Sequence, residues 1–250
     1  MELGILLYVL VGFVAQMIDG ALGMAYGVSS NTFLLSIGVP PAIASASVHV
    51  AETFTTAVSG VSHWRLGNVD KDLFKKLIIP GVLGAMVGAY ILSQIDGNVI
   101  KPYISAYLLI MGIVILVKAL RNNHREQKVT DHISILGVIG GFFDAIGGGG
   151  WGPIVTTTLV ARGNNPRFTI GSVNSSEFFI TFSQSVVFIF ALFSDLVSNW
   201  QVILGLLVGG MIAAPFAAVV TKKLPVRFLM GLVGLLIIGL SIRTILQVIF

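Results

Sequence analysis

The chain has 250 residues, of which 55% are hydrophobic and only 10% charged, and its mean hydropathy is +0.94. A soluble globular domain carries about 25% charged residues, so this composition excludes one and indicates an integral membrane protein embedded in a lipid bilayer. The formal net charge of +4 does not indicate a nucleic-acid partner, because the basic residues lie in short loops between apolar stretches.

The first apolar stretch, Gly4 to Ile37, is nearly uncharged but interrupted in its middle by the segment Asp19 to Gly27. Its two pieces are shorter than the roughly 20 residues that cross a bilayer as a helix. We therefore expect a re-entrant hairpin or a helix broken at membrane depth. The amino terminus lacks the basic region of a cleavable signal peptide, so we expect this stretch to be retained.

Three apolar stretches follow in the first half, and each is long enough to span the membrane. They are Pro41 to Trp64, Leu77 to Ile95 and Ile104 to Leu120. Alternating segments of about ten residues, typical of a β-barrel, are not apparent. The sequence thus predicts a polytopic helical protein. Cysteine is absent, which excludes disulfides and cysteine-ligated metals.

The second half repeats the first with a shift of 125 residues and no gap. Asp19 corresponds to Asp144 and Glu52 to Glu177, and many glycines, prolines and hydroxyl residues follow the same register. We therefore expect two tandem repeats, residues 1–122 and 133–250, joined by a basic cytoplasmic linker at 123–132. The second repeat has its own break, at 144–152, and its own apolar stretches, which include 202–220 and 228–242.

Basic residues indicate how the repeats are oriented. Equivalent loops carry opposite charge: the loop from Arg65 to Lys76 is basic, whereas its counterpart around Asp195 has no basic residue. With an odd number of crossings per repeat, 13 of the 15 Lys and Arg residues share one side, which the positive-inside rule assigns to the cytoplasm. The pattern favours inverted repeats over eight simple spans, with both termini outside.

Four carboxylates, Asp19, Glu52, Asp144 and Glu177, lie in apolar or small-residue segments, where a charge costs at least about 2.5 kcal/mol. They are candidates for proton coupling or gating. The alternative for Asp19 and Asp144 is a neutral carboxyl group bonded to backbone that the glycine breaks leave free.

The two breaks also predict an anion site, because helices that start at mid-membrane point their N–H groups and positive dipole ends at the bilayer centre. Small-residue packing between helices is the alternative interpretation of the glycines and hydroxyls, and Trp151 could simply fill space beside the glycines. The candidate substrate-binding residues are Gly23, Gly27, Ser29, Ser30, Asn31, Ser47, His49, Gly148, Gly149, Gly150, Trp151, Thr156, Thr157, Ser172 and Asn174.

Metal binding and catalysis have weaker support. A metal at His49 and Glu52 would need further ligands that the sequence does not supply, so we expect neither a metal nor a cofactor. No nucleophile and base occur at a recognisable spacing, so we expect no enzyme. His49 itself could carry protons or hydrogen-bond Glu52.

The glycine-rich break after an Asp, with a Ser and a Glu five residues apart in the next helix, occurs twice: Asp19 to Gly27 with Ser47 and Glu52, and 144–152 with Ser172 and Glu177. This duplicated pattern resembles the sulfite exporter TauE/SafE-like family of membrane permeases over essentially the whole chain. The first copy departs from the family's glycine-rich pattern at Leu22, Met24 and Ala25.

The resemblance implies a carrier of small sulfur-containing anions, such as sulfite or sulfonates, in the plasma (inner) membrane of a prokaryote. Together with the residues, it leads to the expectation of a secondary transporter, coupled to protons, that binds its substrate between the repeats. A cation-conducting or cation-coupled protein that uses the four carboxylates is the alternative. The sequence does not indicate the oligomeric state.

Overall fold

The computed structural model describes residues 2–22, 24–120, 131–223 and 226–249, and every regular element in these ranges is helical. The predicted all-helical class is confirmed. The first half contains α1 (Glu2–Leu22), α2 (Tyr26–Ser36), α3 (Pro41–Arg65), α4 (Lys71–Gln94) and α5 (Gly97–Leu120). The second contains α6 (Ile133–Gly147), the π-helical turn η1 (Gly152–Thr156), α7 (Thr157–Ala161), α8 (Pro166–Ser198), α9 (Trp200–Lys223) and α10 (Val226–Ile249).

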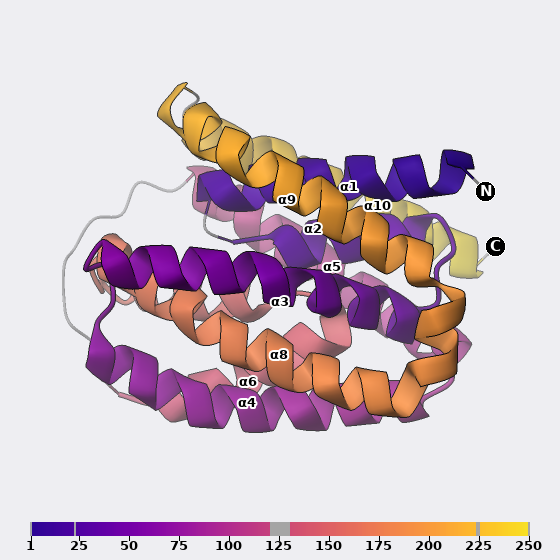
Figure 1. The fold of residues 1–250 in the computed structure, drawn as a ribbon, viewed down its shortest axis with the longest axis horizontal. Helices are drawn as coiled ribbons and strands as arrows, with labels where there is room; N and C mark the ends of the chain where they lie inside the picture. Colours follow the sequence, from indigo (N-terminus) through magenta and orange to yellow (C-terminus); the bar gives the residue numbers. More distant parts are fainter. Residues whose placement is uncertain (1, 23, 121–130, 224–225, 250) are drawn as a thin grey trace.

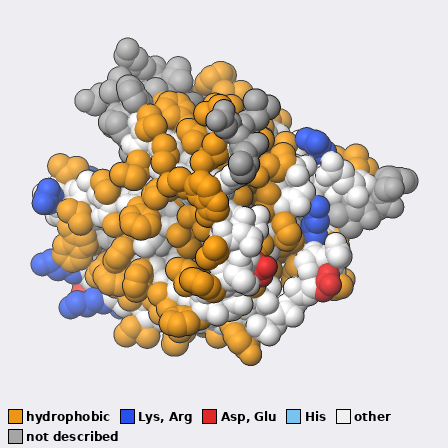
Figure 2. Space-filling model, turned by 45° about the vertical axis from the view of Figure 1, so that its right-hand side comes forward, with side chains coloured by type: hydrophobic (Ala, Val, Ile, Leu, Met, Phe, Trp, Pro, Cys, Tyr) orange, Lys and Arg blue, Asp and Glu red, His pale blue; other side chains and the backbone are white. Residues whose placement is uncertain are grey.

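Several helices are long and apolar enough to cross a bilayer. Within the described ranges these are Lys71–Gln94, Gly97–Leu120, Arg167–Ser198 and Met230–Gln247, and α1, α6 and α9 contribute shorter apolar segments. Apolar side chains cover most of the face in Figure 2, with the visible Lys and Arg toward its edges. Such a surface suits contact with lipid, and the protein is a multi-pass membrane protein.

Both halves have an interruption where the sequence predicts one. In the first, α1 ends at Leu22 and Ala25 adopts a left-handed conformation before α2 begins. In the second, α6 ends at Gly147, and Gly148 and Gly149 have φ angles of 68° and 154°. These angles suit glycine because it lacks a Cβ atom, whereas alanine at φ 91° is strained. Residue 23 and most of the expected linker at 123–132 lie outside the described residues.

The helices of the two halves pack against each other rather than forming separate bundles. α1 packs on α9, α6 on α4, α3 on α8, and α5 on α10 (Figure 1). Small residues allow these helices to approach closely: a methyl group at Gly84 would lie 2.2 Å from the carbonyl oxygen of Val138. The interior is therefore shared by the two halves.

α3 and α8 are antiparallel. The hydroxyl oxygens of Thr53 and Ser185 are 3.2 Å apart, and those of Thr56 and Thr181 are 3.3 Å apart, so residue numbers rise along one helix as they fall along the other. The end of α3 and the end of α8 consequently lie at opposite ends of the bundle (Figure 1).

α5 and α10 are antiparallel as well. A methyl group at Gly112 would lie 3.0 Å from the side chain of Ile237, and one at Gly234 would lie 3.0 Å from the side chain of Leu116. Both chain termini lie at the same end of the molecule in Figure 1.

Candidate functional site

The two interruptions touch each other through their backbones. A methyl group at Gly27 would lie 2.7 Å from both the carbonyl oxygen of Gly148 and the Cα of Gly149, and one at Gly149 would lie 2.2 Å from the amide nitrogen of Val28. The side-chain amide of Asn31 donates a hydrogen bond of 2.5 Å to the carbonyl of Gly147. Only glycine fits at positions 27, 148 and 149, where the two backbones meet.

Asp144 caps the helix that restarts after the second interruption. One carboxylate oxygen accepts hydrogen bonds from the amides of Gly150 and Trp151, at 2.7 and 2.8 Å. The other accepts from Nε2 of Gln184 at 2.8 Å. All three partners are donors, so the buried carboxylate has good hydrogen-bonding compensation and faces the positive end of the helix dipole.

Asp19 has the same position at the first interruption, with a weaker contact. Its carboxylate accepts one hydrogen bond of 3.3 Å from the amide of Tyr26, and the side chain is half-buried. At both interruptions, therefore, an aspartate of the chain already bonds to backbone amides that we had expected to face an anion.

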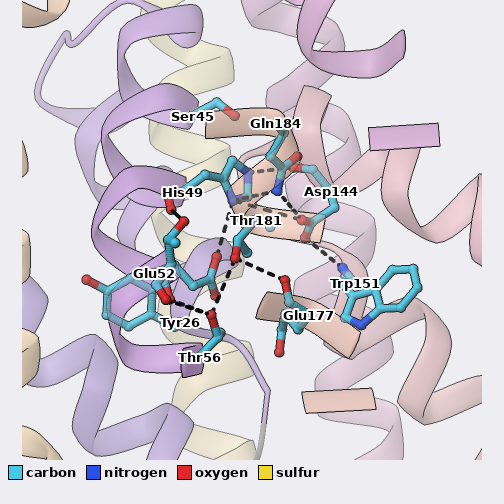
Figure 3. A network of polar contacts seen from close by, with 12 residues as sticks. Tyr26, Ser45, His49, Glu52, Thr56, Asp144, Trp151, Glu177, Thr181 and Gln184 are labelled. Carbon is cyan, nitrogen blue, oxygen red and sulfur yellow. Dashed lines mark hydrogen bonds and ion pairs between the residues drawn. The ribbon is translucent and has the colours of Figure 1, made fainter. Parts of the chain in front are cut away.

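His49 lies at the centre of a buried polar network (Figure 3). Its Nδ1 is 3.2 Å from a carboxylate oxygen of Glu52 and 2.9 Å from Nε2 of Gln184, and its Nε2 is 3.1 Å from the backbone oxygen of Asp144. The ring is stacked parallel to that of Phe188, with the centroids 6.4 Å apart. His49 is fully buried and Glu52 is 5% exposed.

Glu177 lies near this network but has a different environment. It is half-buried, and its backbone oxygen accepts a hydrogen bond of 3.0 Å from Thr181. Thr181 in turn meets Thr56, which donates a bond of 2.8 Å to the backbone oxygen of Glu52 (Figure 3). Two hydroxyls thus lie between the helix turns that carry the two glutamates.

Several of the predicted substrate-binding residues are buried and have polar atoms without a protein partner. Among the described residues, no partner is found for the hydroxyls of Ser29, Ser30, Ser47 and Thr156 or for Oδ1 of Asn31. Buried polar groups rarely remain unpaired, so these atoms are suited to bond to water or to a bound molecule.

Other predicted residues already have partners in the protein. The hydroxyl of Ser172 accepts a bond of 2.8 Å from the amide of Asp70, at the start of α4, and that of Thr157 donates to the backbone of the preceding helical turn. The side-chain amide of Asn174 is 3.5 Å from the hydroxyl of Ser59. Ser172 and Asn174 lie on the part of α8 nearest the end of α3.

Apart from the backbone amides that bond to Asp144, Trp151 and Gly150 have mainly packing contacts. The indole N–H of Trp151 donates to the backbone oxygen of Val173 at 3.2 Å, and a methyl group at Gly81 would lie 2.7 Å from the ring. A methyl group at Gly150 would collide with the hydroxyl of Tyr107. Trp151 therefore fills space beside a glycine, while Gly23 lies outside the described residues.

Gln184 and Ser45 are not among the candidate residues predicted from the sequence. Ser45 donates a bond of 2.5 Å to the carbonyl of Ala145. Ser45 precedes His49 by four residues and Gln184 follows Glu177 by seven, so helical periodicity could have placed each on the face of a residue already identified. Within the described chain, no group of three or more His, Cys, Asp or Glu residues could hold a metal ion.

Broken helices that meet inside an apolar bundle, with carboxylates and unpartnered hydroxyls around them, define a multi-pass helical membrane protein with a polar centre. Among known proteins, a family model described as Sulfite exporter TauE/SafE matches residues 8–244. The chain belongs to this family, whose members are membrane transporters and not enzymes.

Individual relatives agree with this assignment. A probable membrane transporter protein of Bacillus subtilis, YtnM, is 46% identical over 97% of this chain and 83% of its own length. A probable membrane transporter protein of Haemophilus influenzae is 23% identical over 97% of this chain and 98% of its own. The sulfite exporter TauE/SafE family protein 3 of Arabidopsis thaliana is 24% identical over 46% of this chain and 24% of its own. No solved structure matches.

Proposed function

We propose that this protein is a secondary transporter of small sulfur-containing anions such as sulfite or organosulfonates, and that it is coupled to protons. The substrate class comes from the family, which is described as a sulfite exporter family and includes a plant relative of that name. The observation that carries the proposal is the group of buried, unpartnered polar atoms on the helices that restart after the two interruptions, those of Ser29, Ser30, Asn31 and Thr156.

The substrate site would lie between the two interruptions at the level of the bilayer centre. Because Asp19 and Asp144 bond to backbone amides there, hydroxyl groups would supply the principal donors to an oxyanion. We assign this role to the residues with unpartnered hydroxyls and to their neighbours at the interruptions: Ser29, Ser30, Ser47 and Thr156, with Gly27, Asn31, Gly148 and Gly149.

The proposed proton coupling rests on the negative charge of the carboxylates near the site. Four carboxylates near the site would repel an anion if all were ionised, and His49 is the one basic side chain among the residues described around them. Protonation of Glu52 or Glu177 when the substrate binds would reduce this repulsion and link the two fluxes. Asp19 and Asp144 would act as gating residues, because each caps a helix at the junction.

We further propose that residues 1–122 and 133–250 are inverted repeats that move against each other in alternating access. Equivalent helices in repeats of the same orientation would be parallel where they pair, whereas α3 with α8 and α5 with α10 are antiparallel. The repeat counterparts of α1 and α9 are α6 and α4, and these two helices also pack together.

The charge distribution supports an orientation. Arg65, Lys71 and Arg167 lie at the end of the bundle where α3 ends and α8 begins, and Arg167 bonds to Asn68 in the intervening loop. The positive-inside rule would place this end in the cytoplasm of a prokaryotic cell, with both termini outside the plasma membrane.

A cation-coupled or cation-conducting protein is the second candidate, and one observation favours it. Besides the carboxylates, the described polar centre contains acceptors without partners, Oδ1 of Asn31 and Oε1 of Gln184. Oxygen ligands of this kind bind hard cations.

Thermal stabilisation of the purified protein tests these alternatives, because a ligand that binds the folded state raises its stability by about 2.7 kcal/mol at 100 times its Kd. Sulfite, sulfate, a sulfonate, acetate, Na⁺ and Mg²⁺ would each be added at two pH values. We expect sulfite or the sulfonate to stabilise the protein, more strongly at the lower pH.

Ser30→Ala should abolish most of that stabilisation without lowering the stability of the ligand-free protein, because the hydroxyl has no protein partner to lose. Ser62→Ala, which removes an exposed hydroxyl, is the matched control. Stabilisation by cations alone would refute the anion transporter and support the second candidate.

A further inference from the structure

The positions of the hydrogen atoms in the polar network around His49 can be derived, because each group in it has a limited number of donors and acceptors. Gln184 places one nitrogen, Nε2, 2.8 Å from a carboxylate oxygen of Asp144 and 2.9 Å from Nδ1 of His49. An amide NH₂ group has two hydrogens and can donate to both. The reversed amide would put its oxygen against the carboxylate of Asp144, so this orientation is the favourable one.

With Gln184 in this orientation, Nδ1 of His49 is an acceptor. The ring proton is then on Nε2, which donates to the backbone oxygen of Asp144 at 3.1 Å. A neutral imidazole has one donor and one acceptor nitrogen, and this arrangement satisfies both.

Glu52 is the second group that contacts Nδ1 of His49. Its carboxylate oxygen is 3.2 Å from the same Nδ1, which is already an acceptor. An ionised carboxylate would place two acceptors against each other, whereas a protonated carboxyl group would donate to Nδ1 and share its single lone pair with the amide of Gln184 in a three-centre arrangement. If the proton moved to Nδ1 instead, the resulting imidazolium would donate to Glu52, and the amide of Gln184 could no longer donate to Nδ1. In either case the pair holds one proton beyond that of a neutral histidine.

The corresponding place in the second half lacks this chemistry. The counterparts of His49 and Gln184 under the 125-residue shift are Asn174 and Ser59, whose side chains are 3.5 Å apart and do not titrate. Glu177, the counterpart of Glu52, therefore has an amide one helical turn before it instead of an imidazole. The two halves share a scaffold but differ in the group that could exchange a proton with the glutamate.

Ionisable side chains face the Glu52 and His49 pair from several neighbouring helices, and all of them are acidic. They are Asp19 on α1, Tyr26 on α2, Asp144 on α6 and Glu177 on α8, with Tyr107 on α5 beside Asp144. A proton on the pair reduces the negative charge at the centre of this group.

Building on the proposed function, we propose that one transported proton is held between Glu52 and His49 and that Gln184 is the positioning residue that keeps it on Glu52. The second half then has no equivalent proton site, so one proton is bound per chain at this network. Loss of the proton leaves a carboxylate facing the lone pair of Nδ1, and Glu52 must turn away from His49. Since Nε2 of His49 bonds to the backbone oxygen of Asp144, at the second interruption, a change at this pair can be transmitted to that junction.

Infrared spectroscopy of the purified protein tests the position of the proton without any substrate, because a protonated carboxyl group absorbs separately from a carboxylate. We expect one band within the protonated-carboxyl absorption of the wild type to be absent in Glu52→Gln. Gln184→Met keeps the size of the side chain but removes its donors, so the proton should move to His49 and this band should be lost or at least halved. Ser59→Ala, the change at the repeat counterpart, should leave the band unchanged.

If no band is lost in Glu52→Gln, the proton is elsewhere, and if no band is lost in Gln184→Met, Gln184 has only a packing role. Gln184→Ser, which copies the second half, replaces Gln184→Met if the latter elutes as an aggregate. Sulfite uptake into proteoliposomes then separates the two proposals. If the wild type takes up sulfite but the uptake does not respond to a pH gradient, the proton coupling is refuted and the anion transporter is not. If the infrared bands behave as expected but no sulfite is taken up, only the proposed substrate is refuted.

Discussion

At the scale of single residues, Asp144 and Asp19 have equivalent positions but unequal hydrogen bonding. Asp144 accepts three hydrogen bonds of 2.7 to 2.8 Å, and Asp19 accepts one of 3.3 Å. Asparagine has the same shape as aspartate but carries a donor in place of one acceptor oxygen. At Asp144 either orientation of the new amide would place its NH₂ group against an N–H donor.

We therefore expect Asp144→Asn to destabilise the protein by about 1–3 kcal/mol, the cost of a buried donor left without an acceptor. Asp19→Asn is the matched control and should cost less, since its single contact is long and the side chain is half-buried. Unfolding of both variants by heat in the same detergent would measure the difference. An equal or larger loss for Asp19→Asn would contradict the assignment of Asp144 as the stronger cap.

The sequence identified the carboxylates and the contact of Glu52 with His49, but not the other partners. Acidic residues in apolar segments are conspicuous because of their cost in a membrane, and Asp19, Glu52, Asp144 and Glu177 could be identified on that basis. The contact between His49 and Gln184, however, joins residues 135 positions apart, and no local pattern records it. The bonding of Asp19 and Asp144 to backbone at the interruptions was the alternative interpretation of these residues, whereas the preferred interpretation left the backbone amides to face an anion.

At the scale of elements, the junction of the two interruptions depends on the absence of side chains. Gly27→Ala would place a methyl group 2.7 Å from backbone atoms of Gly148 and Gly149, which cannot move aside as a flexible side chain could. We expect a loss of about 1–3 kcal/mol of stability from overpacking, and a decrease in sulfite transport because the two interruptions are forced apart.

Gly231→Ala provides the comparison, because a methyl group at this helical position on α10 meets no atom within 4 Å. It should be neutral or stabilising, since alanine favours a helix over glycine by up to about 1 kcal/mol. Thermal unfolding together with uptake assays would compare the two variants. A Gly27→Ala protein as stable and active as Gly231→Ala would mean that the interruptions are not tightly joined.

The positions of the interruptions could be predicted from the glycines and from apolar pieces too short to cross a bilayer. The departures from regular α-helical geometry could not be predicted from the sequence. α8 extends over 33 residues and carries a non-helical conformation at Leu192, and the second interruption restarts as a π-helical turn. Such deviations depend on contacts with helices distant in sequence, so periodicity within one segment does not reveal them.

At the scale of the whole molecule, the repeat in the sequence and the packing of the helices lead to one testable topology. If the halves are inverted, equivalent loops lie on opposite sides of the membrane. Lys71, the first residue of α4, and Ser194, four residues before the end of α8, lie beside equivalent connections of the two halves, and both are exposed. The antiparallel packing of α3 and α8 puts these loops at opposite ends of the bundle.

Because the chain contains no cysteine, a single cysteine introduced at either position would be its only thiol. We expect Ser194→Cys to react with a membrane-impermeant maleimide in intact cells and Lys71→Cys to react only after the membrane is permeabilised, since the basic end should face the cytoplasm. Reaction of both from the same side would rule out inverted repeats. Reaction of Lys71→Cys alone in intact cells would leave the repeats inverted and reverse the orientation of the protein, so these two variants separate the architecture from its direction in the membrane.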